Sequence, residues 1–412
     1  MILRTTTTRI TRTTLALVAL AMSRPLRGAE YIVTDLGTLG GIFSGAAEIN
    51  NVDQIVGAST LYSGVQHAFL WEDGGMTDLG APEGYIVSSA ASLNDAGQMV
   101  GSVLGAYQSQ YAYIWEDGVW TYLGTLPGPG LDYSAATGAN NAGQIAGYSF
   151  TLGPGGAHRA WIWEDGEMTD LGTLGGEASS ASAINELGQV VGWAQTDDPG
   201  FVTHAFLWED GAMTDLVTLP GDTGSSAADV NQDGQVCGSS THPVPPYSTA
   251  RRACLWDDGV IIDLGVLPGY VKSSASSIND HGQVVGYLGT SLSGSAAAAF
   301  IWEDGVMTNL NTLIPPGSGW VLKSASDINE AGQIVGWGTA PNGESHGFLL
   351  TPFCFADLDG DQDVDLSDLA QLLANYGTIE GATYPDGDLN GDGDVDLADL
   401  AALLSVYGTS CE

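Results

Sequence analysis

Basic residues are scarce in this sequence. Ten lysines and arginines stand against 49 acidic residues among 412, and the formal net charge is −39. Half of the bases (Arg4, Arg9, Arg12, Arg24 and Arg27) lie in the first 27 residues. A chain this negative repels phosphate backbones and anionic lipid headgroups, so we expect no nucleic-acid partner and no binding to a membrane surface. The 44% hydrophobic content argues that the charge does not make the chain disordered.

Long hydrophobic runs are missing as well, and no stretch approaches the ~18 apolar residues of a membrane span. A short apolar run, Leu15 to Met22, follows the basic start. This arrangement predicts a secretory signal over residues 1–29, with cleavage after either Ala21 or Ala29. A disordered N-terminal tail is the alternative. We therefore expect a secreted or cell-surface protein.

Helical spacing of apolar residues is absent from residues 30–353, where one segment instead recurs seven times. It has the form Ile-Asn-x-x-Gly-Gln-x-Val-Gly, and a second segment of the form Phe-Leu-Trp-Glu-Asp-Gly-x-Met-Thr-Asp-Leu-Gly follows it. The repeated asparagines, 44 to 50 residues apart, are Asn50, Asn94, Asn140, Asn185, Asn231, Asn279 and Asn329. A repeat of this length is typical of a propeller or a solenoid.

Turn chemistry predicts four short strands in each repeat. Asn-x-x-Gly-Gln favours a type I turn with glycine in the left-handed position, and Asp-Gly is a strong hairpin signal. The seventh repeat lacks its own last strand, whereas residues 31–37 (YIVTDLG) precede the first repeat and match that strand. We therefore predict an all-β fold over residues 30–353. The predicted fold is a seven-bladed β-propeller of four-stranded blades, closed by the N-terminal strand, with Ala- and Ser-rich strands innermost. An open β-solenoid is the alternative.

The tripeptide His-Ala-Phe at residues 67–69 and 204–206 resembles the HAF-repeat family of bacterial extracellular proteins. The resemblance covers roughly residues 31–350. It implies an exported, propeller-like array and no particular enzymatic activity.

Catalytic motifs are not found in the repeats. The histidines His67, His158, His204 and His346 occupy one repeated position, so they should point to separate places and make local hydrogen bonds. The Glu-Asp pairs are interpreted as solvated hairpin tips and the tryptophans as packing between blades. A catalytic alternative needs titratable residues from several blades at the mouth of the axial channel.

The composition changes from Cys354 onward, where 12 aspartates, two glutamates and no basic residue occur in 59 positions. Two 12-residue segments, 31 residues apart, place oxygen ligands at the positions that Ca²⁺ prefers. The first set is Asp357, Asp359, Asp361, Asp363 (through its carbonyl), Asp365 and Asp368; the second is Asp388, Asn390, Asp392, Asp394 (through its carbonyl), Asp396 and Asp399. We predict two bound Ca²⁺ ions.

Each loop leads into one helix with an apolar face, formed by Leu369, Leu372 and Leu373 in the first copy and by Leu400, Leu403 and Leu404 in the second. This pattern resembles a type I dockerin and predicts a small α-helical, EF-hand-like domain over residues 354–412. The resemblance implies a cohesin-like partner and recognition residues at Leu366, Ser367, Leu397 and Ala398. Gln362 departs from the pattern because it stands where glycine normally eases the turn.

Only four cysteines are present, and their use fits an oxidising compartment. Cys354 and Cys411 bracket the acidic domain, so we predict that they form a disulfide. Cys237 and Cys254 fall on neighbouring strands of the fifth repeat, which predicts a second disulfide; two buried free thiols are the alternative.

These observations predict an exported, non-catalytic binding or scaffold protein. Its propeller would recognise or display, with a possible polysaccharide ligand, and its calcium-binding domain would dock onto a cohesin-like partner. The alternatives are a secreted propeller hydrolase or lyase acting on polysaccharide, and a self-associating surface-structural protein.

Overall fold

The computed structural model describes residues 31–105, 109–127, 133–151, 157–244, 248–359, 363–389 and 393–408. The predicted secretory signal lies outside these residues. Within them, no helix is long and apolar enough to span a membrane.

Each repeat folds into antiparallel strands because its two turn motifs adopt the predicted backbone geometry. In the Trp-Glu-Asp-Gly turns, both aspartate and glycine have positive φ, as at Asp73 (50°) and Gly74 (77°). In the Asn-x-x-Gly turns the glycine is left-handed, and Asp53 takes this conformation (64°) where the first repeat lacks glycine. These are the turns that connect right-twisted strands tightly.

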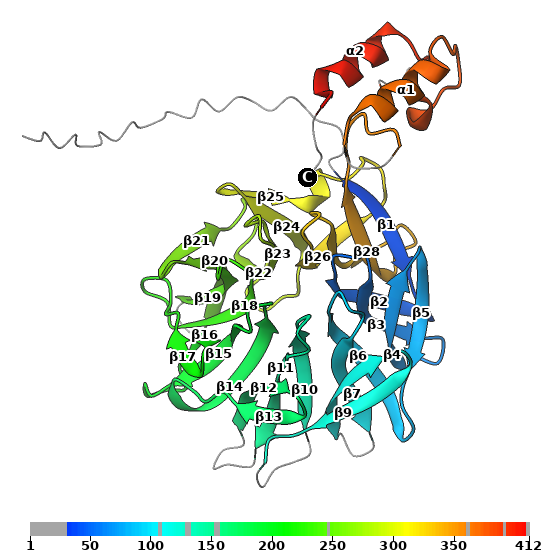
Figure 1. The fold of residues 1–412 in the computed structure, drawn as a ribbon. Helices are drawn as coiled ribbons and strands as arrows, with labels where there is room; N and C mark the ends of the chain where they lie inside the picture. Colours follow the sequence, from blue (N-terminus) through cyan, green and yellow to red (C-terminus); the bar gives the residue numbers. More distant parts are fainter. Residues whose placement is uncertain are drawn as a thin grey trace, which may run out of the picture.

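The first four repeats supply four strands each (Figure 1). In chain order they are β2 (Gly40–Ile49), β3 (Ile55–Leu61), β4 (Gln66–Glu72) and β5 (Gly75–Gly80); β6 (Tyr85–Leu93), β7 (Met99–Gly105), β8 (Gln110–Glu116) and β9 (Val119–Gly124); β10 (Ser134–Ala139), β11 (Ile145–Thr151), β12 (Ala157–Glu164) and β13 (Glu167–Asp170); β14 (Gly175–Ile184), β15 (Val190–Thr196), β16 (Thr203–Glu209) and β17 (Ala212–Asp215).

The fifth and sixth repeats also supply four strands each and the seventh supplies three, with a 3₁₀ turn, η2 (Leu310–Thr312), between the sixth and the seventh. Their strands are β18 (Gly224–Val230), β19 (Val236–Val244), β20 (Ser248–Asp257) and β21 (Val260–Gly265); β22 (Lys272–Ile278), β23 (Val284–Gly289), β24 (Ala298–Glu303) and β25 (Val306–Asn309); β26 (Val321–Ile328), β27 (Ile334–Thr339) and β28 (Ser345–Pro352).

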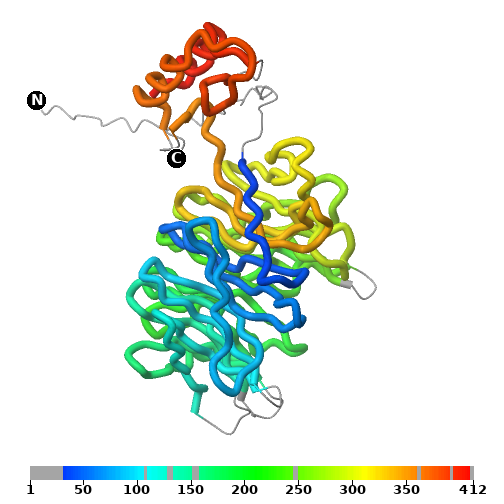
Figure 2. Tube along the Cα trace, turned by 90° about the vertical axis from the view of Figure 1, so that its right-hand side faces the viewer, coloured from blue at the N-terminus to red at the C-terminus, as the bar shows by residue number. Residues whose placement is uncertain are grey.

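The N-terminal strand β1 (Tyr31–Gly37) pairs with β28, the last strand of the seventh repeat, from Tyr31↔Pro352 to Gly37↔Gly347. This confirms the predicted pairing of the two ends of the repeat array. Five sheets have four strands, and a sixth has eight because a single parallel pair, Phe43↔Ser345, joins the first repeat to the seventh. The sheets are arranged around a common centre in a propeller-like fold (Figures 1 and 2).

The repeated asparagines form a ring of hydrogen bonds at this centre. Each Nδ2 donates to the backbone carbonyl of the next repeated asparagine, and Asn329 donates back to Asn50, at 2.9–3.1 Å. A second ring lies beside it, in which the following residue's N–H donates to the equivalent side chain of the next repeat, from Asn51 to Asp95 and finally from Glu330 to Asn51. The motif therefore connects repeats as well as forming turns.

Hydrophobic clusters fill the space between neighbouring repeats. One cluster joins Val191 and Ala205 of the fourth repeat to Val236 and Trp256 of the fifth. This confirms that a repeated tryptophan packs between repeats. The second glycine of the motif is required sterically, because a Cβ at Gly57 would collide with the carbonyl oxygen of Gly45 on the adjacent strand.

The predicted disulfide between Cys237 and Cys254 is wrong, because both cysteines are buried free thiols. Cys237 is opposite Leu255 and Gly238 is opposite Cys254, so the two cysteines are offset by one residue. Successive side chains in a strand point to opposite faces. Accordingly, Cys237 packs against the sixth repeat and Cys254 against the fourth.

The C-terminal region lies beyond the ends of β1 and β28 in both views (Figures 1 and 2). It contains α1 (Leu366–Asn375), the 3₁₀ turn η3 (Tyr384–Asp386) and α2 (Leu397–Val406). Asp365 and Asp396 cap the two helices through capping boxes. Its own core includes Val364, Leu372 and Leu403, each fully buried.

Candidate functional sites

A cavity of about 290 Å³ occupies the centre of the propeller-like array, between the inner strands. Each inner strand has a register shift just before its repeated asparagine, as at Ala46/Glu48 and Ala227/Asp229. Such a bulge turns additional side chains toward one side of the strand. The residue two places before each ring asparagine lines the cavity, and across the repeats this position is occupied by Glu48, Ser92, Gly138, Ala183, Asp229, Ser277 and Asp327.

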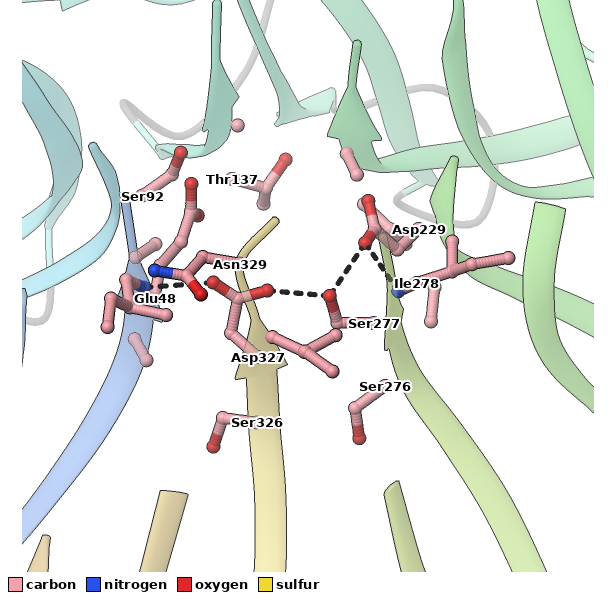
Figure 3. A pocket seen from close by; sticks show the side chains of 18 of the residues that line it. Glu48, Ser92, Thr137, Asp229, Ser276, Ser277, Ile278, Ser326, Asp327 and Asn329 are labelled. Atoms are coloured by element: carbon pink, nitrogen blue, oxygen red, sulfur yellow. Dashed lines mark hydrogen bonds between the residues drawn. The ribbon is translucent and has the colours of Figure 1, made fainter. Parts of the chain in front are cut away.

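Three of these seven residues are acids, and two of them share one serine (Figure 3). Ser277 Oγ lies 2.9 Å from Asp229 Oδ2 and 2.6 Å from Asp327 Oδ1. Backbone N–H groups donate to the same carboxyl groups: Ile278 to Asp229 Oδ2 at 3.0 Å, and Ile49 to Asp327 Oδ2 at 2.9 Å. Among the described residues, no lysine or arginine lines the cavity.

Burial raises the pKa of all three carboxyl groups. It is the largest cause for Asp229, whose pKa rises to about 6, and the neighbouring Asp327 adds to the effect. Burial also raises the pKa of Asp327, while its hydrogen bonds oppose the rise. The pKa of Glu48 is raised well above its usual value by burial and then by Asp327. The cavity is therefore a place where carboxyl groups retain protons at mildly acidic pH.

The small inner residues were predicted, but the three acids were not. The catalytic alternative requires titratable residues from several repeats at the centre of the array. Glu48, Asp229 and Asp327 meet this requirement, which a lining of only Ala, Ser and Gly would not. The only available signal was the variation at this one position when the seven repeats are aligned on asparagine.

The four repeated histidines are not a shared metal site. His67, His204 and His346 each contact an aspartate on the adjacent strand: Asp78 at 2.8 Å, Asp215 at 2.9 Å and Asp35 at 2.8 Å, respectively. This confirms the predicted local role. His158 was wrongly aligned with them, because Arg159 takes that position and pairs with Asp170 at 3.0 Å.

The prediction that the Glu-Asp pairs are solvated hairpin tips holds only in part, because many of the glutamates have a partner. In five repeats the glutamate of Trp-Glu-Asp-Gly accepts a hydrogen bond from the glutamine of the asparagine turn, as between Gln54 and Glu72 at 2.9 Å. These glutamates therefore tie the two turns of one sheet together.

Aromatic side chains gather on the second and third repeats. In the second repeat Tyr111 and Tyr122 take the places of the histidine and its aspartate, and Tyr85 packs against both, with ring centroids at 6.0 and 5.4 Å. Tyr122 is 43% exposed. Burial and the neighbouring Tyr85 raise its pKa to about 12.

The third repeat continues this surface. Tyr133 and Tyr148 lie 6.3 Å apart, and both rings contact His158. Tyr133 also bridges to Gln110, the residue before Tyr111, so the two groups of rings are neighbours. We call Tyr85, Tyr111, Tyr122, Tyr133, Tyr148, Phe150 and His158 the aromatic patch.

The acidic side chains of the first C-terminal loop converge. Carboxyl oxygens of Asp357, Asp359 and Asp368 lie within 4.8 Å of one another, and so do those of Asp363, Asp365 and Asp368. These are the only such trios in the described part of the chain. Hard oxygen ligands in this number fit Ca²⁺, with the side chain of Asp363 joining the group where its carbonyl was expected.

Two of the predicted ligands in the described residues are buried at equivalent places. Asp368 accepts backbone N–H groups of Leu358 at 2.6 Å and Asp365 at 2.7 Å, and Asp399 accepts that of Leu389 at 2.9 Å. Asp388 accepts from Gly393, Asp394 from Glu380, and Asp396 from Ala398. Asp361, Asn390, Asp392, Gln362 and Cys411 lie outside the described residues, so the bond between Cys354 and Cys411 stays a prediction.

The predicted apolar helix faces need one correction. Leu372 and Leu403 are buried, but Leu373 is 50% and Leu404 is 53% exposed. The core formed with Val364 and Val395 contains Leu372 and Leu403 but not Leu373 or Leu404. The predicted recognition residues Leu366 and Leu397 are 65% and 67% exposed, while the backbone N–H groups of Ser367 and Ala398 bond the capping aspartates.

Comparisons with known proteins give limited information. A family described as "Protein of unknown function (DUF3466)" matches residues 220–340. No curated protein matches the sequence.

Among solved structures, oligogalacturonate lyase from Vibrio parahaemolyticus is similar at 11% identity, with a TM-score of 0.49, covering 80% of this chain and 92% of that one. The β-propeller domain of the Trilobed protease from Pyrococcus furiosus gives 11% identity, a TM-score of 0.48, and coverage of 79% and 94%. TolB from Acinetobacter baumannii gives 12% identity and a TM-score of 0.40, covering 76% of this chain and 65% of TolB. These similarities concern the fold alone.

Proposed function

We propose that this chain is an exported binding and attachment protein, in which a closed seven-bladed propeller is carried by a calcium-folded C-terminal module. The seven-membered asparagine ring and the pairing of β1 with β28 support seven blades and closure. A closed propeller leaves only the short outer edges of its blades open to pairing, which suits a protein working outside the cell.

The observation that carries the attachment role is the duplicated acidic loop, with buried Asp368 and Asp399 at equivalent positions before equivalent helices. So many carboxyl groups in a small module repel one another until a cation neutralises them. Two Ca²⁺ ions would therefore supply folding free energy to this module.

The same duplication presents matching apolar side chains to solvent. Leu366 and Tyr376, at the start and just after the end of α1, correspond to Leu397 and Tyr407 at α2, and all four are at least 44% exposed. Exposed apolar residues without a partner in the chain favour a protein-binding surface. The ligand we propose for this surface is a cohesin-like domain.

The test is the binding of the full chain to an immobilised type I cohesin domain, with calcium and with chelator. We expect binding only with calcium, and loss of binding in the double variant Leu366→Ala/Leu397→Ala. The double variant Val52→Ala/Val306→Ala, exposed on the propeller, is the control. Calcium-dependent self-association with no cohesin binding would support a structural surface protein instead.

A second candidate function, recognition of a neutral polysaccharide, is favoured by the aromatic patch. Tyrosine offers an apolar ring face and a polar hydroxyl, which match the C–H face and the hydroxyl edge of a sugar. Arg159, which follows His158 on β12, is paired with Asp170 at 3.0 Å, and this pairing offsets the positive charge that an anionic polymer would seek.

Sedimentation of the full chain with insoluble cellulose and with a neutral β-glucan tests this candidate, and soluble polygalacturonate serves as the anionic comparison. We expect Tyr122→Ala to weaken binding to a neutral polymer about tenfold, the effect of roughly 1.4 kcal/mol. Tyr62→Ala, 95% exposed and outside the patch, should have no effect. Equal binding by both variants would exclude the patch.

A further inference from the structure

In the central cavity, one serine hydroxyl contacts two aspartate carboxyl groups but has only one proton to donate. Ser277 Oγ is within hydrogen-bonding distance of both Asp229 and Asp327, at 2.9 and 2.6 Å. A hydroxyl group has one proton to donate, and an ionised carboxylate can only accept. If both aspartates were ionised, one of the two contacts would bring lone pairs together without a proton between them.

Backbone donors reach both carboxyl groups of the bridge. Asp229 accepts N–H groups at both oxygens, from Val230 at 2.8 Å and from Ile278 at 3.0 Å. Asp327 accepts the Ile49 N–H at Oδ2 and is also bonded by the Ile328 N–H, while its Oδ1 faces Ser277. One proton on either carboxyl group lets that group donate to Ser277 Oγ, which then donates to the other aspartate. With this shared proton every atom of the bridge has a partner; Figure 3 shows the contacts concerned.

We propose that the folded protein holds one proton on the Asp327–Ser277–Asp229 bridge and that this proton is a pH-sensitive latch on the ring. Asp229, Ser277 and Asp327 come from the fifth, sixth and seventh repeats, and the bond to Ile49 reaches the first. The bridge therefore spans the junction where the two ends of the array meet. This inference is independent of the calcium module and of the aromatic patch.

The surroundings favour the protonated form. Burial and then the neighbouring Asp327 raise the pKa of Glu48 on β2, which lines the same cavity, and burial raises the pKa of Glu330 after β26, so the cavity disfavours negative charge. The Cys237 thiol on β19 lies close to Asp229, and burial raises the pKa of this thiol, so it remains neutral. No cation among the cavity-lining residues offsets these charges.

The direction of the pH effect follows from linkage. The pKa of Asp229 is raised to about 6 from 3.8, so between these values the folded state holds a proton that the unfolded state has lost. Its stabilising contribution is complete at low pH and is lost as the pH rises through about 6. From this group alone we expect the unfolding constant to increase about tenfold between pH ~5 and pH ~8.

The experiment is urea unfolding of the full chain from pH ~5 to pH ~8, with calcium held constant and saturating. In Asp327→Asn the amide N–H₂ donates permanently to Ser277, so we expect a flattened pH profile and greater stability than the wild type at the alkaline end. Asp117→Asn, on an exposed turn with φ of 50°, is the matched control and should keep the wild-type profile. Parallel profiles for Asp327→Asn and the wild type would overturn the proposal.

Infrared spectroscopy of the wild type gives a second readout that does not depend on a variant folding. The C=O band of protonated carboxyl groups, to which Glu48 also contributes, should be present at pH ~5.5, where exposed carboxyl groups are ionised, and should weaken as the pH is raised. Absence of this band at pH ~5.5 would also overturn the proposal.

Discussion

Replacing one ring asparagine should destabilise the whole propeller. Asn185 is 3% exposed, and its side chain makes four hydrogen bonds. Nδ2 donates to Gln189 Oε1 at 2.7 Å and to the Asn231 carbonyl at 2.9 Å, while Oδ1 accepts from the N–H groups of Leu187 at 3.1 Å and Gln189 at 3.0 Å. Asn185→Ala removes all four.

The magnitude follows from the groups that are left behind. The Asn231 carbonyl and the Gln189 N–H are buried with the ring, and each loses the bond that Asn185 supplied. A buried polar group without a partner costs about 1–3 kcal/mol and a lost hydrogen bond about 1 kcal/mol; since the Asn231 carbonyl keeps the Gly234 N–H at 3.2 Å, we expect a loss of about 2–4 kcal/mol. Neighbouring asparagines on other blades should give similar values because the geometry repeats.

Equilibrium unfolding in urea, followed by tryptophan fluorescence at constant calcium, measures this loss. The control is Asn51→Ala in the second ring of hydrogen bonds, where the exposed side chain accepts one bond, from the Glu330 N–H at 3.1 Å. That variant should lose less than about 1 kcal/mol. A loss for Asn185→Ala no larger than that of the control would refute the claim that the asparagine ring holds the blades together.

Three further results are expected. In Ile32→Cys/Thr351→Cys, oxidation should form a bond between the two ends of the array, because these residues are paired across β1 and β28; failure to cross-link would contradict closure. Cys237 and Cys254 should be unreactive to thiol reagents in the folded protein and fully reactive in urea; a peptide map in which these two cysteines are joined by a disulfide would argue against the observed offset. Asp399→Ala should lower the calcium-dependent helical signal of the full chain, since the carboxyl group at 0% exposure bonds two backbone N–H groups; an unchanged signal would argue against its role.

The turns and strands could be predicted because their causes are local. Asp-Gly and Asn-x-x-Gly set φ and ψ over four residues, and repetition makes these signals recognisable seven times. The pairing of residues 31–37 with the last repeat was also accessible, since a missing strand at one end matched an extra strand at the other.

Features that depend on register or on bulges could not be obtained in this way. A one-residue offset decides that Cys237 and Cys254 face apart, and no local signal fixes that offset. The acids at Glu48, Asp229 and Asp327 point into the cavity only because each inner strand bulges there. The residue type at this repeat position also varies, from glycine to glutamate, so the position lacks the regularity that identified the other motif residues.

The two loops and helices of the C-terminal module were predicted, but not which leucines of each helix are buried. The spacing of Leu369, Leu372 and Leu373 defines one broad face, and sequence spacing does not say which part of it is covered. The core formed by the paired loops covers Leu372 and leaves Leu373 half exposed.

Calorimetric titration of the calcium-free full chain with Ca²⁺ tests the central functional claim most directly. We predict two ions per chain, one ion for Asp368→Ala, and none for the double variant Asp368→Ala/Asp399→Ala. No heat of binding at millimolar calcium, or the same stoichiometry in the double variant, would contradict a calcium-folded attachment module.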